Sequence, residues 1–275
     1  MANSGICNQS SDLRAMKRGN PVTRIIFVRT VQASLCAIAL HVLTGWPLTG
    51  SHALGLFVTP FLCLYFVFVF VAPWSWGLSI LNRLRTVEKV VVLSFDDGPS
   101  EMTFAVLDCL YKHKTQATFF VLGEAAERYP ELIRRMNAEG HTVGIHAWRH
   151  AAFVGLGSRR IADEVHCTQE AIRRACPEAP PTRWLRPPHG FKSIRALWFA
   201  RTQGLRLAAW SSDSRDYRDT QPESIAWRVT HNLRPGAIIL LHDGPRNSAT
   251  VEALPLILRG LQKQHFSCVP LERVF

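Results

Sequence analysis

Two adjacent acids, Asp96 and Asp97, are of a type and in a position that could serve metal binding or proton transfer. They directly follow an apolar run, residues 90–95 (VVVLSF), which is typical of a buried β-strand. Because successive strand residues point to opposite faces, a strand that continued would separate the two carboxylates. The tripeptide Asp97-Gly98-Pro99 is also an ordinary turn signal, so these residues alone leave a simple loop corner open.

Two histidines four residues apart, His146 and His150, lie in the segment GHTVGIHAWRH. This spacing predicts a helical turn with both imidazoles on one face, where they can bind the same metal ion. His141 in the same segment suits a surface or packing position. A metal bound by two histidines and one carboxylate keeps open positions for water and a substrate oxygen. One acid can then bind the metal while its neighbour accepts a proton from water, and Arg186 can relieve their repulsion.

The elements that must position these residues alternate along the chain after residue 88. Strand patterns cover residues 90–95, 117–121, 142–145, 183–185, 206–210, 237–241 and 266–269. Helical patterns cover residues 102–113, 129–138, 159–175, 194–203, 222–232 and 250–263. This alternation predicts an α/β fold with a parallel sheet, closed as a barrel or open and doubly wound. The segment is shorter than the roughly 250 residues of a complete eight-unit barrel, and a truncated (β/α) barrel fits it.

Ionisable residues collect at the predicted strand ends, where parallel α/β folds carry their chemistry. In chain order, the residues at or just after these ends are Asp96, Asp97, His146, Arg186, residues 211–216 and His242. Five strand ends with such residues are hard to attribute to chance. Together they favour a metal-dependent active site.

Five motifs, SFDDGPS, HAWRH, RPPHG, WSSDSRDY and LLHDG, occur in this order along residues 89–275. Their order and spacing resemble those of the polysaccharide deacetylase family, the NodB-homology carbohydrate esterases of carbohydrate esterase family 4. The resemblance implies a distorted or truncated (β/α) barrel, NodB-like, that removes an N-acetyl group from an amino sugar in a glycan or glycan precursor. It also implies a divalent metal ion, for which we expect Zn²⁺, with Co²⁺ or another divalent ion as the alternative.

The resemblance further implies a role for each motif residue. Asp96 would be the general base, and the metal ligands would be Asp97, His146 and His150. His242 would protonate the leaving amine. Arg186 would hold Asp96, and Asp216 would hold His242. The substrate would be contacted by Pro188, His189 and Tyr217, with the backbone amide at His189 helping to hold the oxyanion.

Three positions depart from the family pattern. Ala147 stands where Ser or Thr is common, which removes one hydroxyl beside the metal ligands. His189 replaces the usual Tyr, and Tyr217 replaces the usual Trp. All residues for metal binding and proton transfer are present, so the departures bear on the sugar preference.

A charge-free stretch between Arg29 and Arg83 predicts a membrane segment. We expect a basic tail over residues 1–28 and a membrane segment over residues 29–82 with two transmembrane helices, near 31–48 and 54–72. The catalytic domain would follow over residues 89–275. A buried helical hairpin is the soluble alternative. The formal net charge of +11 suggests nucleic acid, but the N-terminal basic residues flank apolar runs, which favours anionic membrane lipid.

The membrane topology follows from basic residues on both sides of the segment. They predict that the catalytic domain of this integral protein faces the cytoplasm of a bacterial-type cytoplasmic membrane. If only the second predicted helix crosses the membrane, the catalytic domain lies outside the cytoplasm. The seven scattered cysteines include no CxxC pair, which argues against a disulfide-built extracellular domain. The oligomeric state is not predicted.

Alternative functions stay open at this point. The nearest is a deformylase or deacylase of a lipid-linked sugar, held close to the bilayer by the membrane segment. A non-catalytic glycan-binding module would be expected to lose Asp96 or a histidine ligand, and both are kept. A scaffold subunit of a membrane glycan-synthesis complex is distinguished by the absence of turnover.

Overall fold

The computed structural model describes residues 80–190, 193–231 and 233–274, which belong to one compact unit that begins at Ile80. The predicted basic tail and nearly all of the predicted membrane segment lie outside the described residues. Of the helices within the described ranges, none is both long and apolar enough to cross a membrane.

The described residues form a curled, nine-stranded sheet in the order β1-β6-β5-β4-β3-β2-β8-β7, with β9 beside β2. The strands are β1 (Ile80–Leu81), β2 (Val90–Asp96), β3 (Thr118–Val121), β4 (Thr142–Ile145), β5 (Trp184–Leu185), β6 (Arg206–Ala208), β7 (Ser212–Asp213), β8 (Ile238–His242) and β9 (Ser267–Cys268). Their pairings are parallel. The predicted parallel α/β architecture is confirmed as a curled half-barrel.

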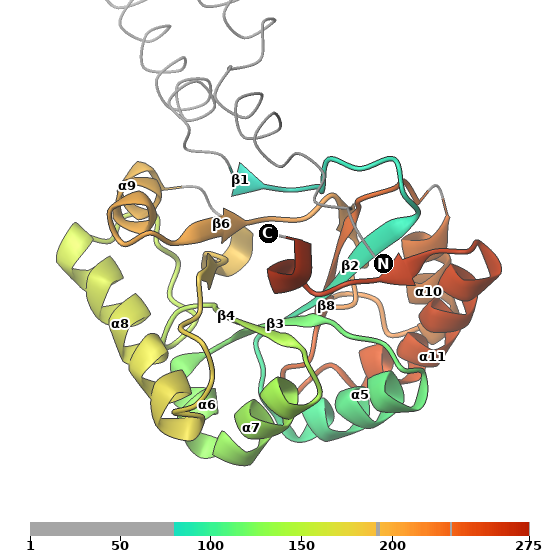
Figure 1. The fold of residues 1–275 in the computed structure, drawn as a ribbon, viewed down its shortest axis with the longest axis horizontal. Helices are drawn as coiled ribbons and strands as arrows, with labels where there is room; N and C mark the ends of the chain where they lie inside the picture. The colour runs from blue at the N-terminus through green and yellow to red at the C-terminus, as the bar shows by residue number, and fades with distance from the viewer. Residues whose placement is uncertain (1–79, 191–192, 232, 275) are drawn as a thin grey trace, which may run out of the picture. The chain divides into compact units, whose positions relative to one another are not determined.

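Helices lie outside the curled sheet (Figure 1). They are α5 (Glu101–Lys112), α6 (Gly123–Arg128), α7 (Pro130–Ala138), α8 (Ser158–Ala175), α9 (Ile194–Thr202), α10 (Pro222–Thr230) and α11 (Ser248–Lys263). Helix α5 begins at a capping box, in which the Ser100 hydroxyl accepts the Met102 amide and Thr103 Oγ1 accepts the Ser100 amide. This cap fixes the chain directly after the Asp-Asp pair.

Strand β2 is the central element, and it is buried on both faces as expected for a parallel sheet. Side chains alternate along it, so Val92, Ser94 and Asp96 share one face. Val92 belongs to a buried core cluster that also contains Phe120, Trp184 and Ile238. The same face therefore runs from an apolar core at Val92 to a carboxylate at the carboxyl end of the strand.

Several predicted bounds differ from the observed ones. Strand β1 lies at the end of the predicted membrane segment, and its Ile80 and Leu81 pair with Leu207 and Ala208 of β6. The sheet therefore begins before residue 89, the predicted start of the catalytic domain. The two-residue strands β1 and β7 and the six-residue helix α6 were not predicted, because such short segments show little periodicity.

Candidate active site

The structure brings the predicted residues together at the carboxyl ends of the central strands. Asp96 and His242 are the last residues of β2 and β8 and lie opposite each other in the parallel register. His146 directly follows β4, and Arg186 directly follows β5. Neighbouring strands of one sheet thus supply both a carboxylate pair and a histidine pair.

Asp97 turns out of the strand path with a φ of 71°. This left-handed conformation ends β2 and places both carboxylates beside one imidazole. His146 Nε2 lies 3.7 Å from Asp96 Oδ2 and 3.4 Å from Asp97 Oδ1. The two acids therefore face the same site although they are adjacent in sequence, and a simple loop corner does not account for them.

Asp97, His146 and His150 form a group of donors suited to a metal ion. Asp97 Oδ1 lies 3.1 Å from His150 Nε2, and one ligand atom from each of the three residues lies within 4.8 Å of the others. Within the described residues, this buried Asp97 oxygen has no hydrogen-bond partner. Such an oxygen, aimed at two imidazole nitrogens, fits a divalent cation.

The orientation and protonation of these donors also suit a metal. His146 Nδ1 lies 2.7 Å from the Arg186 carbonyl oxygen, which leaves Nε2 directed into the site. Burial alone would raise the pKa of Asp97, but His146, His150 and His242 lower it to about 2. Burial lowers the pKa of His150. Near neutral pH the site therefore offers a carboxylate and a neutral imidazole, the forms that bind metals.

A bound divalent ion would polarise a substrate carbonyl and increase the acidity of water at the site.

The predicted helical turn at His146 and His150 is wrong. The intervening residues form a loop in which Ala147 and His150 have φ values of 94° and 58°. The two rings still converge, with centroids 5.2 Å apart. The loop conformation, with its two left-handed residues, therefore brings the rings together in place of a helical face. His141 packs in the interior, edge-on to Phe119, as predicted for a packing residue.

Arg186 holds Asp96 through a fully buried ion pair. Its Nη1 donates to Asp96 Oδ1 at 2.6 Å and to Ser94 Oγ at 2.9 Å, and its Nη2 donates to the Ala209 carbonyl at 3.1 Å. The guanidinium lies 4.0 Å from the ring centroid of Phe120. Burial lowers the pKa of Arg186, opposed by the charge of Asp96. These contacts fix Asp96 Oδ1 and leave Oδ2 directed at His146.

The buried Asp216 holds the partly buried His242 in a second pair. Asp216 Oδ1 lies 2.7 Å from His242 Nδ1, while Oδ2 accepts the His242 amide at 2.7 Å and the Thr250 hydroxyl at 2.6 Å. Burial alone would lower the pKa of His242, but the hydrogen bond and charge of Asp216, helped by Asp96 and Asp97, raise it to about 9. The ring is therefore protonated near neutral pH and can act as an acid.

The three predicted substrate contacts differ in exposure. His189 is exposed, and its ring centroid lies 4.3 Å from that of His150. Tyr217 is 48% exposed, and its ring centroid lies 5.5 Å from that of His242. Each exposed side chain thus stands beside one histidine of the site. Pro188 is buried, so it can act on a substrate only through the turn that it shapes.

Asp243 lies under the site and was not predicted. Its amide donates to the Asp96 carbonyl at 3.0 Å, and its Oδ2 accepts the Thr103 hydroxyl at 2.6 Å. Burial raises its pKa to about 7, opposed by the Thr103 hydrogen bond and helped by Asp97 and Asp96. Its position directly after His242 in the last motif was the available signal. Ser94, which contacts Arg186, was also missed although it opens the motif SFDDGPS. Thr250, which contacts Asp216, was missed too and lies outside the five motifs.

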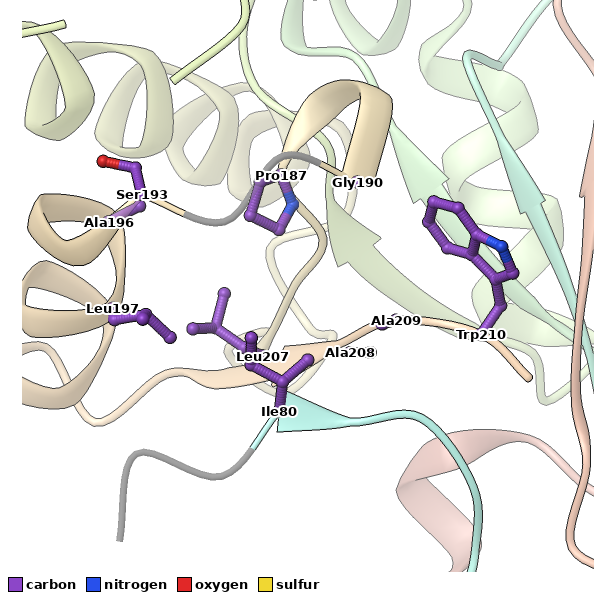
Figure 2. A pocket seen from close by; sticks show the side chains of 10 residues that line it. All are labelled: Ile80, Pro187, Gly190, Ser193, Ala196, Leu197, Leu207, Ala208, Ala209 and Trp210. Carbon is purple, nitrogen blue, oxygen red and sulfur yellow. The ribbon is translucent and has the colours of Figure 1, made fainter. Parts of the chain in front are cut away.

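An apolar pocket lies beside the site, on the side of β1, β6 and α9 (Figure 2). Its lining includes Ile80, Leu197, Leu207 and Trp210. It contains none of the predicted metal-ligating or proton-transfer residues. The chemistry therefore lies at the strand ends, outside this pocket.

Comparison with known proteins agrees with this arrangement. The model of the polysaccharide deacetylase family matches residues 83–208. A chitooligosaccharide deacetylase of Bradyrhizobium sp. is 39% identical over 199 residues, which cover 68% of this chain and 90% of the relative. A peptidoglycan-N-acetylglucosamine deacetylase of Bacillus cereus is 34% identical over 210 residues, which cover 74% of this chain and 75% of the relative.

A solved structure shows the same fold. It is a peptidoglycan N-acetylglucosamine deacetylase in complex with a naphthalenyl N-hydroxybenzamide, with a TM-score of 0.69 and 31% sequence identity. The match covers 74% of this chain and 96% of that one. Fold and site together define a hydrolase of amide bonds in N-acetylated sugars. The chain belongs to the polysaccharide deacetylase family.

Proposed function

We propose that the chain removes the N-acetyl group from N-acetylglucosamine residues of a short chitooligosaccharide. The observation that carries this proposal is the pairing of Asp96 with His242 at adjacent strand ends, beside the donors Asp97, His146 and His150. The high coverage of the Bradyrhizobium chitooligosaccharide deacetylase supports an oligosaccharide over a polymer. Peptidoglycan is the alternative, supported by the Bacillus cereus relative.

The reaction adds water across the amide and gives acetate and a free amine. Asp96, held by Arg186, takes a proton from the attacking water. His242, held by Asp216, donates a proton to the departing nitrogen as the carbon–nitrogen bond breaks. Asp97, His146 and His150 would hold the metal ion. We propose Zn²⁺, because two imidazoles and one carboxylate are typical of catalytic zinc sites, with Co²⁺ as the alternative.

Mass spectrometry of the products tests this function. The purified chain is incubated with N-acetylglucosamine oligomers of increasing length and, separately, with peptidoglycan fragments. We expect oligomers that have lost the mass of one acetyl group, and no such product with His150→Ala. Acetyl loss from peptidoglycan fragments alone would replace the oligosaccharide substrate, and loss from neither would contradict deacetylation.

We also propose that residues 29–79, the part of the predicted membrane segment that precedes β1, anchor the enzyme in the membrane, with its catalytic domain facing the cytoplasm. This rests on the charge-free stretch and its basic flanks, which also make membrane lipid a partner. Strand β1 limits the anchor to residues before 80. A reporter that is active only outside the cytoplasm, fused to the end of the chain, should stay silent. A strong signal would place the domain outside.

A cytoplasmic domain at the membrane makes a lipid-linked sugar a second alternative substrate, besides peptidoglycan. Mass spectrometry of membrane lipids from cells with and without the protein distinguishes a lipid-linked sugar from a soluble oligosaccharide. A glycolipid that changes by one acetyl or formyl mass would favour the lipid-linked substrate, and unchanged lipids would favour the soluble oligosaccharide.

A further inference from the structure

The loop that carries the two histidines, residues 146–150, is held from two sides. On one side, the amides of Trp148 and Arg149 both donate to Glu164 Oε2, at 2.8 and 3.1 Å. On the other side, the amide of Gly123 at the start of α6 donates to the Ala147 carbonyl at 3.0 Å. The backbone between the histidines is therefore bonded through both its donors and its acceptors.

The conformation of this loop needs such support. Ala147 and His150 both adopt left-handed φ values, which are unfavourable for residues other than glycine. Backbone of this kind persists only where its surroundings hold it in place. Of the contacts that the structure gives, Glu164 supplies the side-chain acceptor for the two amides that directly precede His150.

Glu164 is placed for this task by α8. Its side chain is buried, with the residue 8% exposed, on the helix face that also buries Ile161, Val165 and Thr168. An acid on the apolar face of a helix is costly unless it is hydrogen-bonded. The position of Glu164 within this apolar pattern is the sequence signal that could have revealed it.

We propose that Glu164 is a positioning residue that fixes His150 for metal binding. Within the described residues its carboxylate accepts hydrogen bonds from the Trp148 and Arg149 amides, so it acts on His150 through the backbone. The inference rests on the metal site of the proposed function. Partners of this kind beside metal ligands typically contribute about 10- to 100-fold to metal affinity.

Metal titration of the full-length chain tests the proposal without any activity measurement. The protein is stripped with a chelator and titrated with Co²⁺, and both the dissociation constant and the visible absorption spectrum are recorded. We expect Glu164→Ala to weaken binding about 10- to 100-fold and to alter the spectrum. Asp163→Ala, an exposed acid on the neighbouring position, should match the wild type.

Two further variants separate positioning from charge and from folding. Glu164→Gln keeps an oxygen at the same reach and should bind Co²⁺ nearly as the wild type does. Glu164→Asp keeps the charge but is shorter, and it should bind weakly. If Glu164→Ala does not fold, the Co²⁺ affinities of Glu164→Gln and Glu164→Asp test the positioning role instead.

Wild-type affinity and spectrum in folded Glu164→Ala, or in Glu164→Asp, would overturn the proposal. The proposal would also be overturned if Glu164→Gln bound Co²⁺ as weakly as Glu164→Asp. If the wild type itself does not bind Co²⁺, the metal site of the proposed function is wrong. If the wild type binds Co²⁺ and folded Glu164→Ala binds it equally well, only the role of Glu164 is wrong.

Discussion

Replacing Asp216 by Asn removes the negative charge from the Asp216–His242 pair. The carboxylate of Asp216 bonds His242 Nδ1 at 2.7 Å and is the main reason that the pKa of His242 is raised from 6.5 to about 9 against the effect of burial. At 1.36 kcal/mol per pKa unit, this corresponds to roughly 3 kcal/mol in favour of the protonated ring. Asn removes the charge and keeps the size, so the pKa of His242 should fall toward its ordinary value of 6.5, with Asp96 and Asp97 still opposing the effect of burial.

The expected loss of activity depends on pH. At pH of about 8, a ring with a pKa of about 9 is roughly nine-tenths protonated, whereas one with a pKa of 6.5 is about one-thirtieth protonated. If protonated His242 donates the proton to the leaving amine, Asp216→Asn should be about 30-fold slower than wild type there. At pH of about 5.5 both rings are mostly protonated, so this part of the difference should nearly disappear.

Stability should follow the same titration. The folded-state pKa of His242 lies above its unfolded value of 6.5, so the pair stabilises the fold fully below pH 6.5 and loses this contribution as the pH rises through about 9. Denaturant unfolding should show wild type more stable than Asp216→Asn by up to roughly 3 kcal/mol at low pH, with a smaller difference above pH 9.

The assay is the ratio of wild-type to variant kcat/KM across this pH range, with the His242 ring titrated directly by NMR. Because both proteins keep the other titrating groups of the site, a change of the ratio with pH reports on the Asp216–His242 pair. The reasoning would be refuted if the ratio of kcat/KM values were the same at pH of about 5.5 and about 8. An unchanged His242 pKa in Asp216→Asn would refute it as well.

Three further predictions concern the other parts of the site. His150→Ala should remove metal binding, since three protein ligands leave no redundancy, and full metal content in the purified variant would exclude His150 as a ligand. Asp96→Asn should keep its metal and lose about 10²-fold or more in turnover, so wild-type turnover would exclude Asp96 as the base. Gly98→Ala would place a Cβ 2.3 Å from Asp243 Oδ2, and denaturant unfolding should show a loss of about 1–3 kcal/mol. Gly157→Ala, whose Cβ meets nothing within 4 Å, is the control, and an equal effect there would contradict the steric argument.

The convergence of site residues could be predicted from the sequence because parallel sheets align the ends of their strands. Asp96 and His242 lie 146 positions apart in the chain, yet each ends an apolar run that reads as a strand. The pairing of these two residues then follows from the register of β2 and β8. The apolar run before each residue, together with the alignment of strand ends in a parallel sheet, was sufficient to place Asp96 and His242 at one edge of the sheet.

The conformation of the loop at His146 and His150 could not be predicted in this way. The left-handed backbone of Ala147 and His150 has no signal in their residue types, because glycine is the residue that usually marks it. The loop is fixed instead by tertiary contacts with α6 and α8. Asp243 was missed for a related reason, since its partner Thr103 lies at the start of a distant helix.

The central claim is that this chain cleaves the amide of an N-acetylated sugar with Asp96 as base and a metal at Asp97, His146 and His150. The most direct test measures acetate and free amine released from an N-acetylglucosamine oligomer by the purified chain. We expect equal amounts of both products, lost on chelation, restored by Zn²⁺ and nearly absent in Asp96→Asn. No acetate from the Zn²⁺-loaded wild type, or equal rates for wild type and Asp96→Asn, would contradict the claim.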